Sequence, residues 1–410
     1  MTAADVHGAH AARTRSIALL AVAQVAALAL WFSTTAALPG LLQQRALSPW
    51  TQSLFTSAVQ LGFVIGSLVS TALGLADRLD PRRFFAVSAL VGAAANGLIV
   101  TLDPASPLVI ALRLVTGVAL AGVYPVGMKM VASWAEGDLG LLVGLLVGAL
   151  TLGSALPHLF NSFGGVAWQT ALLMASASAI VAAGLVFGVA VGPRFAKGAG
   201  FRRELIRRAW DDKPIRLAIL GYLGHMWELY AVWAWIGVFF LARLQAESQI
   251  AATGTRAALA SFAVIAAGAL GCLFGGWIAD RWGRTRLTAL SMAISGACCI
   301  LAGVAWSGPL WALVALSLVW GFFIVSDSAQ FSSCVAELAD AGMVGTMLTL
   351  QTALGFTLTL ATIHLMPHFV DWFGWRWAFA PLAVGPFLGV WAMLALRAMP
   401  ASERLAGGRR

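Results

Sequence analysis

Two side chains that can exchange a proton stand three residues apart in a long apolar stretch. His225 and Glu228 belong to the segment Tyr-Leu-Gly-His-Met-Trp-Glu, which begins at Tyr222. Residues three apart on a helix are neighbours on one face, so an imidazole and a carboxylate there can share or relay a proton. The alternative is a polar pair that only holds this helix to its neighbours. We expect both residues to take part in proton transfer and in binding a solute.

Three further charged residues interrupt apolar stretches of the chain. Arg113 is a candidate to attract an anionic group, whereas Lys129, near the end of the same stretch, can extend to a polar boundary. Asp327 lies in a Ser-Asp-Ser segment, where it either carries a proton or pairs with backbone groups. Charges inside a membrane cost roughly 2.5–3.5 kcal/mol each on insertion scales, so they usually face a cavity or a partner.

Several uncharged side chains are candidates to bind an organic solute. Tyr124, Tyr222 and Tyr230 are all the tyrosines of the chain, and a buried tyrosine usually needs a hydrogen-bond partner. By helical angle Trp233 falls on the side of Tyr222, whereas Tyr230 points roughly 80° away. Gln351 is a weaker candidate in a polar helix. The predicted binding set is Arg113, Tyr124, Tyr222, His225, Glu228, Trp233 and Gln351.

A metal site, a cofactor site and an enzyme are not expected. His225 and Glu228 supply two potential ligands, but a hydrolytic metal site needs three protein ligands and usually a longer motif. The four cysteines lie in or at the end of apolar stretches, which suits packing better than a disulfide framework. No glycine-rich phosphate loop is present, which excludes an ATP-driven pump within this chain.

The composition identifies the elements that must position these residues. Of 410 residues, 60% are hydrophobic and only 10% are charged, against about 25% charged in soluble proteins. Because a membrane-spanning helix needs about 20 apolar residues, we expect an all-α polytopic membrane protein with twelve transmembrane helices. The expected helices cover 16–40, 51–75, 84–102, 107–132, 140–160, 168–192, 217–242, 257–279, 286–306, 309–334, 343–367 and 377–398.

The twelve stretches divide six and six. We expect an N-terminal half at 1–192, a basic linker at 193–216 and a C-terminal half at 217–410. The segment Leu-Ala-Asp-Arg ending at Arg78 recurs as Ile-Ala-Asp-Arg ending at Arg281, and other landmarks recur at nearly the same offset. Such an internal duplication is typical of secondary transporters with pseudo-symmetric halves.

Charge placement predicts the orientation. The net charge is +9, but the basic residues lie between apolar stretches rather than in a patch for nucleic acid. With both termini in the cytoplasm, the external segments hold four of the 26 Lys and Arg residues: Arg45, Arg243, Arg256 and Arg376. The positive-inside rule then places both termini in the cytoplasm of a cell (inner) membrane.

The sequence resembles the major facilitator superfamily over nearly its whole length. The segment from Gly276 to Arg286 is similar to the family's loop signature, and a degraded copy follows the second stretch. Arg113 with Gly117 resembles the family's helix 4 signature. The resemblance implies a cytoplasmic latch and a central cavity lined by helices 1, 4, 7 and 10. The expected latch residues are Asp77, Arg78, Gly276, Asp280, Arg281, Gly283 and Arg284.

The resemblance implies a secondary transporter that works by alternating access. We expect a small organic solute, an organic anion because of Arg113, coupled to protons through Glu228, His225 and Asp327. The alternatives are drug or metabolite efflux by proton antiport and an uncoupled facilitator. The helix 5 signature of drug antiporters is absent, which counts against efflux. The expected partners are the solute, protons and the lipid bilayer, without nucleic acid, and a monomer suffices.

Overall fold

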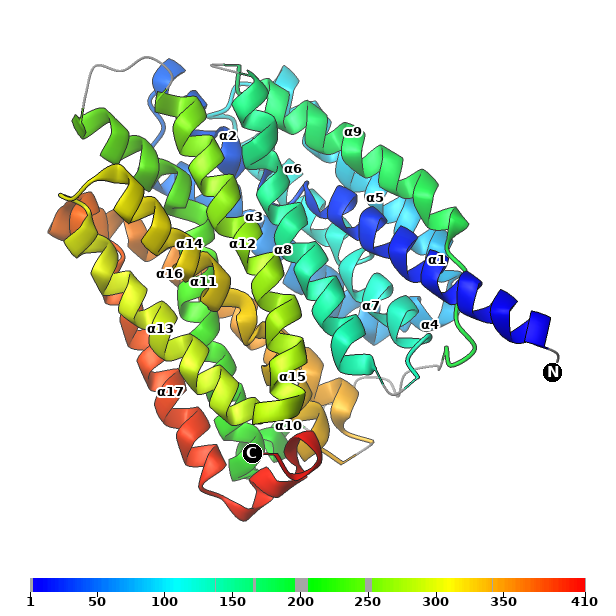
Figure 1. The fold of residues 1–410 in the computed structure, drawn as a ribbon. Helices are drawn as coiled ribbons and strands as arrows, with labels where there is room; N and C mark the ends of the chain where they lie inside the picture. The colour runs from blue at the N-terminus through cyan, green and yellow to red at the C-terminus, as the bar shows by residue number, and fades with distance from the viewer. Residues whose placement is uncertain are drawn as a thin grey trace.

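The computed structural model describes residues 3–136, 138–164, 167–195, 206–247, 253–340 and 342–409. Every regular element in these ranges is a helix (Figure 1). Within them, twelve helices are long and apolar enough to cross a membrane. Each overlaps one of the twelve apolar stretches, so the prediction of an all-α polytopic fold is confirmed.

The N-terminal half contains the first six spans. They are α1 (Ala3–Leu28) with α2 (Ser33–Gln44), α3 (Pro49–Leu73), α5 (Pro81–Leu98) with η1 (Ile99–Thr101), α6 (Pro107–Leu120) with α7 (Tyr124–Ala132), α8 (Leu139–Gly164), and α9 (Gln169–Leu185) with η2 (Val186–Gly188). The short helix α4 (Leu75–Arg78) follows α3.

The C-terminal half contains the other six spans. They are α11 (Lys213–Glu247), α12 (Thr253–Trp282), α13 (Arg284–Ala305), α14 (Leu310–Ser326) with α15 (Ser328–Leu338), α16 (Val344–Trp377), and η4 (Ala380–Ala383) with α17 (Val384–Arg397). The short helices α10 (Ile206–Asp211) and η5 (Pro400–Gly408) lie outside the spans.

The predicted linker lies partly outside the described residues, which omit 196–205. Its described part includes α10 and the start of α11. The division of the chain at 192 and 217 therefore stays a prediction. The eleventh span is longer than predicted, because α16 continues through Pro367 to a kink at Gly374, where φ is 67°.

Three N-terminal spans begin with the same local chemistry. Ser48, Asp80 and Ser106 accept hydrogen bonds from the first backbone N–H groups of α3, α5 and α6. Each is followed by a proline. Proline suits the first helical position because a backbone N–H there has no acceptor within the helix, so nothing is lost by its absence. Arg82 and the N–H of Arg83 hold the pKa of the Asp80 carboxyl below its usual value. Local sequence thus determines where these spans start.

Spans one, four and ten are interrupted along their length. A turn at residues 29–32 separates α1 from α2, residues 121–123 separate α6 from α7, and Asp327 separates α14 from α15. Spans four and ten hold the same position in the two halves, so their breaks are repeated. Discontinuous helices are typical of transporter binding sites, because a break frees backbone groups to face a cavity.

The bundle has two ends, which we name by the chain termini. The terminal end holds the start of α1 and the end of α17, and both chain ends lie in the lower part of Figure 1. The far end holds the loops that join odd-numbered spans to the next span within each half. Because successive spans alternate in direction, α3 runs from the far end to the terminal end, and α8, α11 and α16 run the opposite way.

Glycines bring helices together inside each half. A Cβ on Gly62 of α3 would lie 2.1 Å from the Leu114 carbonyl oxygen of α6, and one on Gly271 of α12 would lie 2.0 Å from the Phe322 oxygen of α14. Neither site can accept even a methyl group without moving backbone. The two GxxxG segments therefore hold span two to span four and span eight to span ten, as small residues do in membrane bundles.

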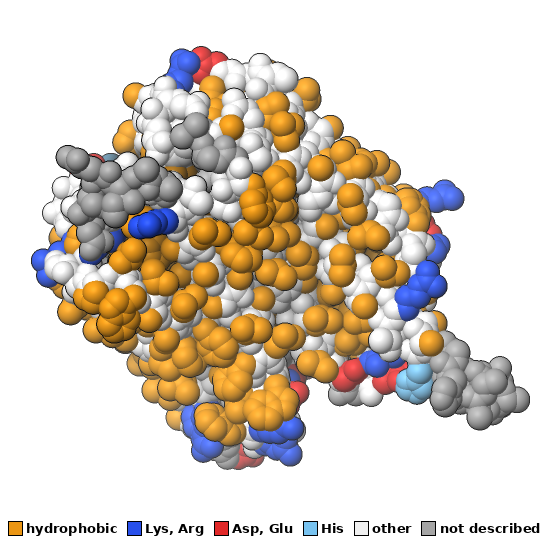
Figure 2. Space-filling view, turned by 45° about the horizontal axis from the view of Figure 1, so that its top comes forward, with side chains coloured by type: hydrophobic (Ala, Val, Ile, Leu, Met, Phe, Trp, Pro, Cys, Tyr) orange, Lys and Arg blue, Asp and Glu red, His pale blue; other side chains and the backbone are white. Residues whose placement is uncertain are grey.

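The lateral surface of the bundle is apolar. Figure 2 shows hydrophobic side chains spread over one face, with Lys and Arg residues toward its borders. Leu270, Trp311 and Trp391 are at least 61% exposed. Large exposed apolar side chains over a broad band match the hydrocarbon core of a bilayer.

Candidate functional site

A cavity of about 350 Å³ lies between the two halves. The N-terminal half lines it with α3, α7 and α8, and the C-terminal half with α11, α14, α15 and α16. On α3 the lining residues run from Phe63 to Thr71, near the terminal end, and on α8 they run from Val143 to Thr151, again nearer that end. The cavity therefore lies on the terminal side of the bundle.

The cavity lining includes aromatic rings and hydroxyl groups. Tyr124, Tyr222, Tyr230 and Trp233 all line it. Among the described lining residues none carries a formal charge. The aliphatic hydroxyls come from both halves: Ser67, Thr71, Thr151, Ser328, Ser332, Thr349 and Thr352. Such a surface can stack on a ring and form hydrogen bonds with neutral groups.

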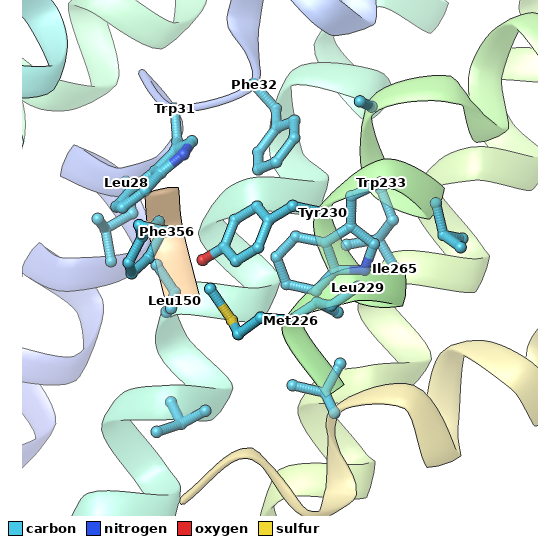
Figure 3. Packing of buried hydrophobic residues seen from close by; sticks show 14 of the residues in the cluster. Leu28, Trp31, Phe32, Leu150, Met226, Leu229, Tyr230, Trp233, Ile265 and Phe356 are labelled. Carbon is cyan, nitrogen blue, oxygen red and sulfur yellow. The ribbon is translucent and has the colours of Figure 1, made fainter. Parts of the chain in front are cut away.

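Aromatic side chains from both halves close the far side of the cavity (Figure 3). Tyr230 lies with its ring centroid 6.2 Å from that of Trp31, 6.0 Å from Phe32 and 5.1 Å from Phe356. Trp233 meets Phe32 edge-on at 5.7 Å. We call Trp31, Phe32, Tyr230, Trp233 and Phe356 the aromatic roof. Because its members come from both halves, it must separate for the cavity to open at the far end.

His225 pairs with Asp327 rather than with Glu228. Its Nδ1 lies 3.0 Å from Asp327 Oδ1, and both side chains are at most 2% exposed. Asp327 lies at the break between α14 and α15, next to Ser328, which lines the cavity. The His225 Nε2 atom has no hydrogen-bond partner among the described residues. The structure thus joins two of the three predicted proton-coupling residues beside the cavity wall.

Glu228 points away from that pair, toward α13 and α14. Its carboxylate accepts hydrogen bonds from Trp320 Nε1 at 2.6 Å, Ser295 Oγ at 2.9 Å and Cys299 Sγ at 3.1 Å. It is buried and is not among the residues that line the cavity. The carboxyl group therefore connects three helices of the C-terminal half.

Arg113 is fully buried within the N-terminal half. Its guanidinium donates to the carbonyl oxygens of Leu30, Trp31 and Phe55 and to the side chains of Ser33 and Asn96, at 2.5–3.1 Å. Arg113 is not among the residues that line the cavity. The position that would attract an anion is thus occupied by acceptors of the chain itself.

The comparisons with known proteins agree with this architecture. Residues 20–359 match the family model of the Major Facilitator Superfamily. The chain belongs to this superfamily. The fold is similar to a crystal structure of a mutant of the nucleoside transporter NupG, with a TM-score of 0.71 at 13% identity over 93% of this chain and 99% of that one. As a superfamily member the protein is a multi-pass membrane protein and a secondary transporter.

A curated relative adds no functional information. It comes from Thermoproteus tenax and is described as an uncharacterized 38 kDa protein in a 23S RNA operon. It is 28% identical over 276 residues, which are 65% of this chain and 68% of the relative.

The superfamily's loop motif lies at the terminal end in both halves. In the N-terminal half, Lys129 Nζ contacts the Asp77 carboxylate, lies 3.2 Å from the Ala76 oxygen and sits 4.5 Å from the centre of the Phe195 ring. Arg78 is exposed. Lys129 therefore joins span four to the loop that follows span two.

The C-terminal copy of the motif reaches across to the other half. A Cβ on Gly140, near the start of α8, would lie 3.4 Å from Asp280 Oδ2. Gly276 faces the same helix one turn earlier. Gly283, with φ of 96°, makes the turn from α12 to α13, and Arg281 stacks 4.0 Å above Trp277. Gly276 and Asp280 thus lie at the seam between the halves.

Arg284 forms the most extensive ion pair at this end. It donates to both carboxylate oxygens of Glu337, at 2.9 and 2.6 Å, and to Gln330 at 2.6 Å. Its Nη2 lies 3.6 Å from Asp280. Arg284 therefore fixes α15 to the loop motif, and Glu337 is a partner that sequence reasoning did not identify.

The structure brings three of the seven predicted binding residues to the cavity: Tyr124, Tyr222 and Trp233. Gln351 is buried beside Thr352, and neither of its amide atoms has a partner among the described residues. Sequence reasoning missed Tyr230, which lines the cavity although its helical angle differs from that of Tyr222. The helical angle failed to find this tyrosine because a wide sector of α11, rather than one narrow face, borders the cavity.

No group of three His, Cys, Asp or Glu side chains that could hold a metal ion occurs in the described part of the chain. The cysteines Cys272, Cys298, Cys299 and Cys334 are buried and free.

Proposed function

We propose that this protein transports a small, uncharged, ring-bearing organic solute by alternating access coupled to protons. The observation that carries the proposal is the cavity of about 350 Å³ between the halves, which falls in the range of about 300–1,000 Å³ of small-molecule sites. Its three tyrosines and Trp233 supply ring faces, and its hydroxyls supply neutral hydrogen-bonding groups.

The character of the cavity lining favours an uncharged solute over the organic anion expected from the sequence. The anion was expected because of Arg113, whose guanidinium bonds to Leu30, Trp31 and Phe55 instead of facing the cavity. NupG is a nucleoside transporter by its description, and a nucleoside is a ring-bearing solute with hydroxyl groups. The likeness to NupG shows the fold alone, so nucleosides enter here as the first probes to try.

Proton coupling is proposed for the pair of His225 and Asp327. The pair is buried, adjoins the cavity and includes the residue at the break of span ten. Protonation can drive transport only if it has a different effect on the two conformations. A charge change at a break between α14 and α15 meets this requirement, because the two segments can move relative to each other there. Glu228 serves in this proposal to hold α11 in place.

We further propose that the protein lies in the cell (inner) membrane with both termini in the cytoplasm and works as a monomer. The distribution of Lys and Arg supports this orientation. The cavity, which lies toward the terminal end, then faces the cytoplasm in the conformation described. Each chain contains both halves, so one copy supplies the complete cavity.

Uptake into proteoliposomes tests the proposal. The probes are uridine and adenosine, benzoate as an organic anion, and tetraphenylphosphonium as a lipophilic cation, each with and without a pH gradient. A gradient of one unit stores about 1.4 kcal/mol per proton, enough for about tenfold accumulation with one proton per solute. We expect Asp327→Asn to abolish this accumulation and to retain exchange of the same solute without a gradient.

The matched control is Asp371→Asn, which changes an exposed aspartate on α16 and should accumulate the probe as the unchanged protein does. Gradient-driven uptake of benzoate alone would show that the solute is an organic anion, as the sequence predicted. A response to tetraphenylphosphonium alone would indicate drug or metabolite efflux. Uptake that is the same with and without the pH gradient, and the same in Asp327→Asn as in the unchanged protein, would identify the protein as an uncoupled facilitator.

A further inference from the structure

Arg113 holds the interrupted part of span one. A turn at residues 29–32 leaves carbonyl groups without the N–H partners that a continuous helix would provide. The Leu30 oxygen lies 3.1 Å from Arg113 Nη1, and the Trp31 oxygen lies 2.5 Å from Nη2. Nη1 also donates to Ser33 Oγ, at the first residue of α2. The guanidinium thus binds two carbonyl groups of the turn and the first residue of α2.

The same guanidinium is anchored to the rest of the N-terminal half. Its Nε donates to the Phe55 oxygen of α3, and Nη1 donates to Asn96 Oδ1 on α5. Asn96 in turn donates to the Leu172 oxygen and Ser176 Oγ on α9. The break in span one is therefore fixed to α3 and α5 by Arg113 itself and to α9 through Asn96.

The residues held in this way belong to the aromatic roof. Trp31 and Phe32 are the last two residues of the turn, and both side chains extend toward Tyr230 (Figure 3). Trp31 Nε1 also donates to Gln60 of α3 at 3.1 Å. Two roof members of the N-terminal half thus sit on the backbone segment that Arg113 binds.

We propose that Arg113 is a positioning residue that keeps the aromatic roof closed at the far end, and that it does not contact the solute. The inference rests on the alternating-access part of the proposed function. Its chemistry requires an arginine, because five N–H donors in a planar fork can reach acceptors on three sides. A lysine has three donors around one nitrogen and cannot reach the two turn carbonyls and the Phe55 carbonyl of α3 at once.

The test measures access to the cavity from the far end, without any solute. Val64→Cys places a thiol on the cavity lining, while the native cysteines are buried. In oriented vesicles a membrane-impermeant maleimide is added at the far side or at the terminal side. With Arg113 present we expect labelling from the terminal side and little from the far side.

In the protein that carries Val64→Cys, Arg113→Gln should raise the far-side labelling rate about tenfold. This rise corresponds to a free energy of roof opening that is lower by about 1.4 kcal/mol. Arg113→Lys should restore part of the closure. Trp31→Ala removes a roof member directly and shows that the reporter detects opening. The matched control is Arg243→Gln, which removes another buried arginine that donates to a far-end carbonyl, that of Gly308, and should leave far-side labelling unchanged.

Equal labelling with Arg113→Gln and with the unchanged arginine would overturn the inference, as would an equal rise in the Arg243 control. If Arg113→Gln does not accumulate in the membrane, Asn96→Ala and Ser33→Ala replace it, because each removes one acceptor of the Arg113 guanidinium. Each must raise the far-side labelling rate, by less than tenfold. Because labelling needs no solute or proton gradient, failure of the proposed transport function would not alter this result.

Discussion

Glu228 and Asp327 are both buried carboxyl groups, yet their surroundings differ. Glu228 accepts hydrogen bonds from three neutral donors, of which Trp320 is the nearest at 2.6 Å. Asp327 lies 3.0 Å from the imidazole of His225. A carboxyl group with neutral donors on other helices stabilises a bundle, whereas one beside a titratable imidazole can change its charge during a cycle. The two residues are therefore expected to respond differently to mutation.

Replacing Glu228 should reduce stability before it affects coupling. Glu228→Ala leaves the Trp320 N–H unpaired in the bundle interior and should lower the free energy of unfolding by about 2 kcal/mol. Ser295→Ala removes a single hydrogen bond and should cost about 0.6 kcal/mol. Thermal unfolding in detergent measures both variants. A Glu228→Ala variant with unchanged thermal stability and no gradient-driven uptake would instead assign the coupling proton to Glu228.

At the scale of elements, the closest glycine contacts with backbone lie inside each half rather than at the seam between the halves. A Cβ on Gly275 of α12 would lie 1.9 Å from the Ser326 oxygen of α14, inside one half. A Cβ on Gly144 or Gly148 of α8 would lie 3.3 Å from a carbonyl oxygen of α12, across the seam. At these glycines the helix backbones approach more closely within a half than across the seam, where the contacts are still close.

Two glycine substitutions test this contrast. Gly275→Ala should lower the free energy of unfolding by about 1–3 kcal/mol, because the backbone of α14 must move to admit the methyl group. Gly184→Ala on α9 meets nothing within 4 Å and should raise it by about 0.5–1 kcal/mol, since alanine favours a helix. Thermal unfolding of the two variants in one detergent compares them, and equal effects would contradict tight packing at Gly275.

At the scale of the whole molecule, the conformation is closed at the far end and hollow toward the terminal end. Ser57 of α3 and His364 of α16 lie 2.9 Å apart, atom to atom, across the two halves. The Trp50 ring lies 4.2 Å from the His364 ring. These contacts lie at the far end, with the aromatic roof, so any opening of the cavity at that end requires them to break.

A covalent bridge at this contact should stop transport. We expect a short bifunctional thiol reagent to join the two cysteines of a Ser57→Cys, His364→Cys variant and to reduce uptake to background. The cavity should remain reachable from the terminal side. A chain that also carries Val64→Cys, bridged first with reagent added at the far side, should still react with an impermeant maleimide added at the terminal side. Each single-cysteine variant treated with the reagent is the control. Undiminished uptake by the bridged protein would show that the far end does not open during transport.

Much of the architecture could be predicted from the sequence, whereas the candidate site could be predicted only in part. Hydropathy predicts all twelve spans and the charged or glycine-rich loops that separate them. Tyr124, Tyr222 and Trp233 line the cavity as their residue types suggested. The pairing of His225 with Glu228 does not occur, because helical spacing places two residues on nearby faces without saying which neighbouring helix each face meets.

The sequence by itself determined the number, order and composition of the spans. In a bilayer each backbone polar group must find a partner within the protein, so long apolar stretches become helices whatever their neighbours are. The tertiary structure alone decided which polar groups meet: Asp327 approaches His225 from about one hundred residues away, and Arg113 reaches the break near Trp31. These partners are set by how separate helices pack, and the side-chain order along one helix carries no information about that.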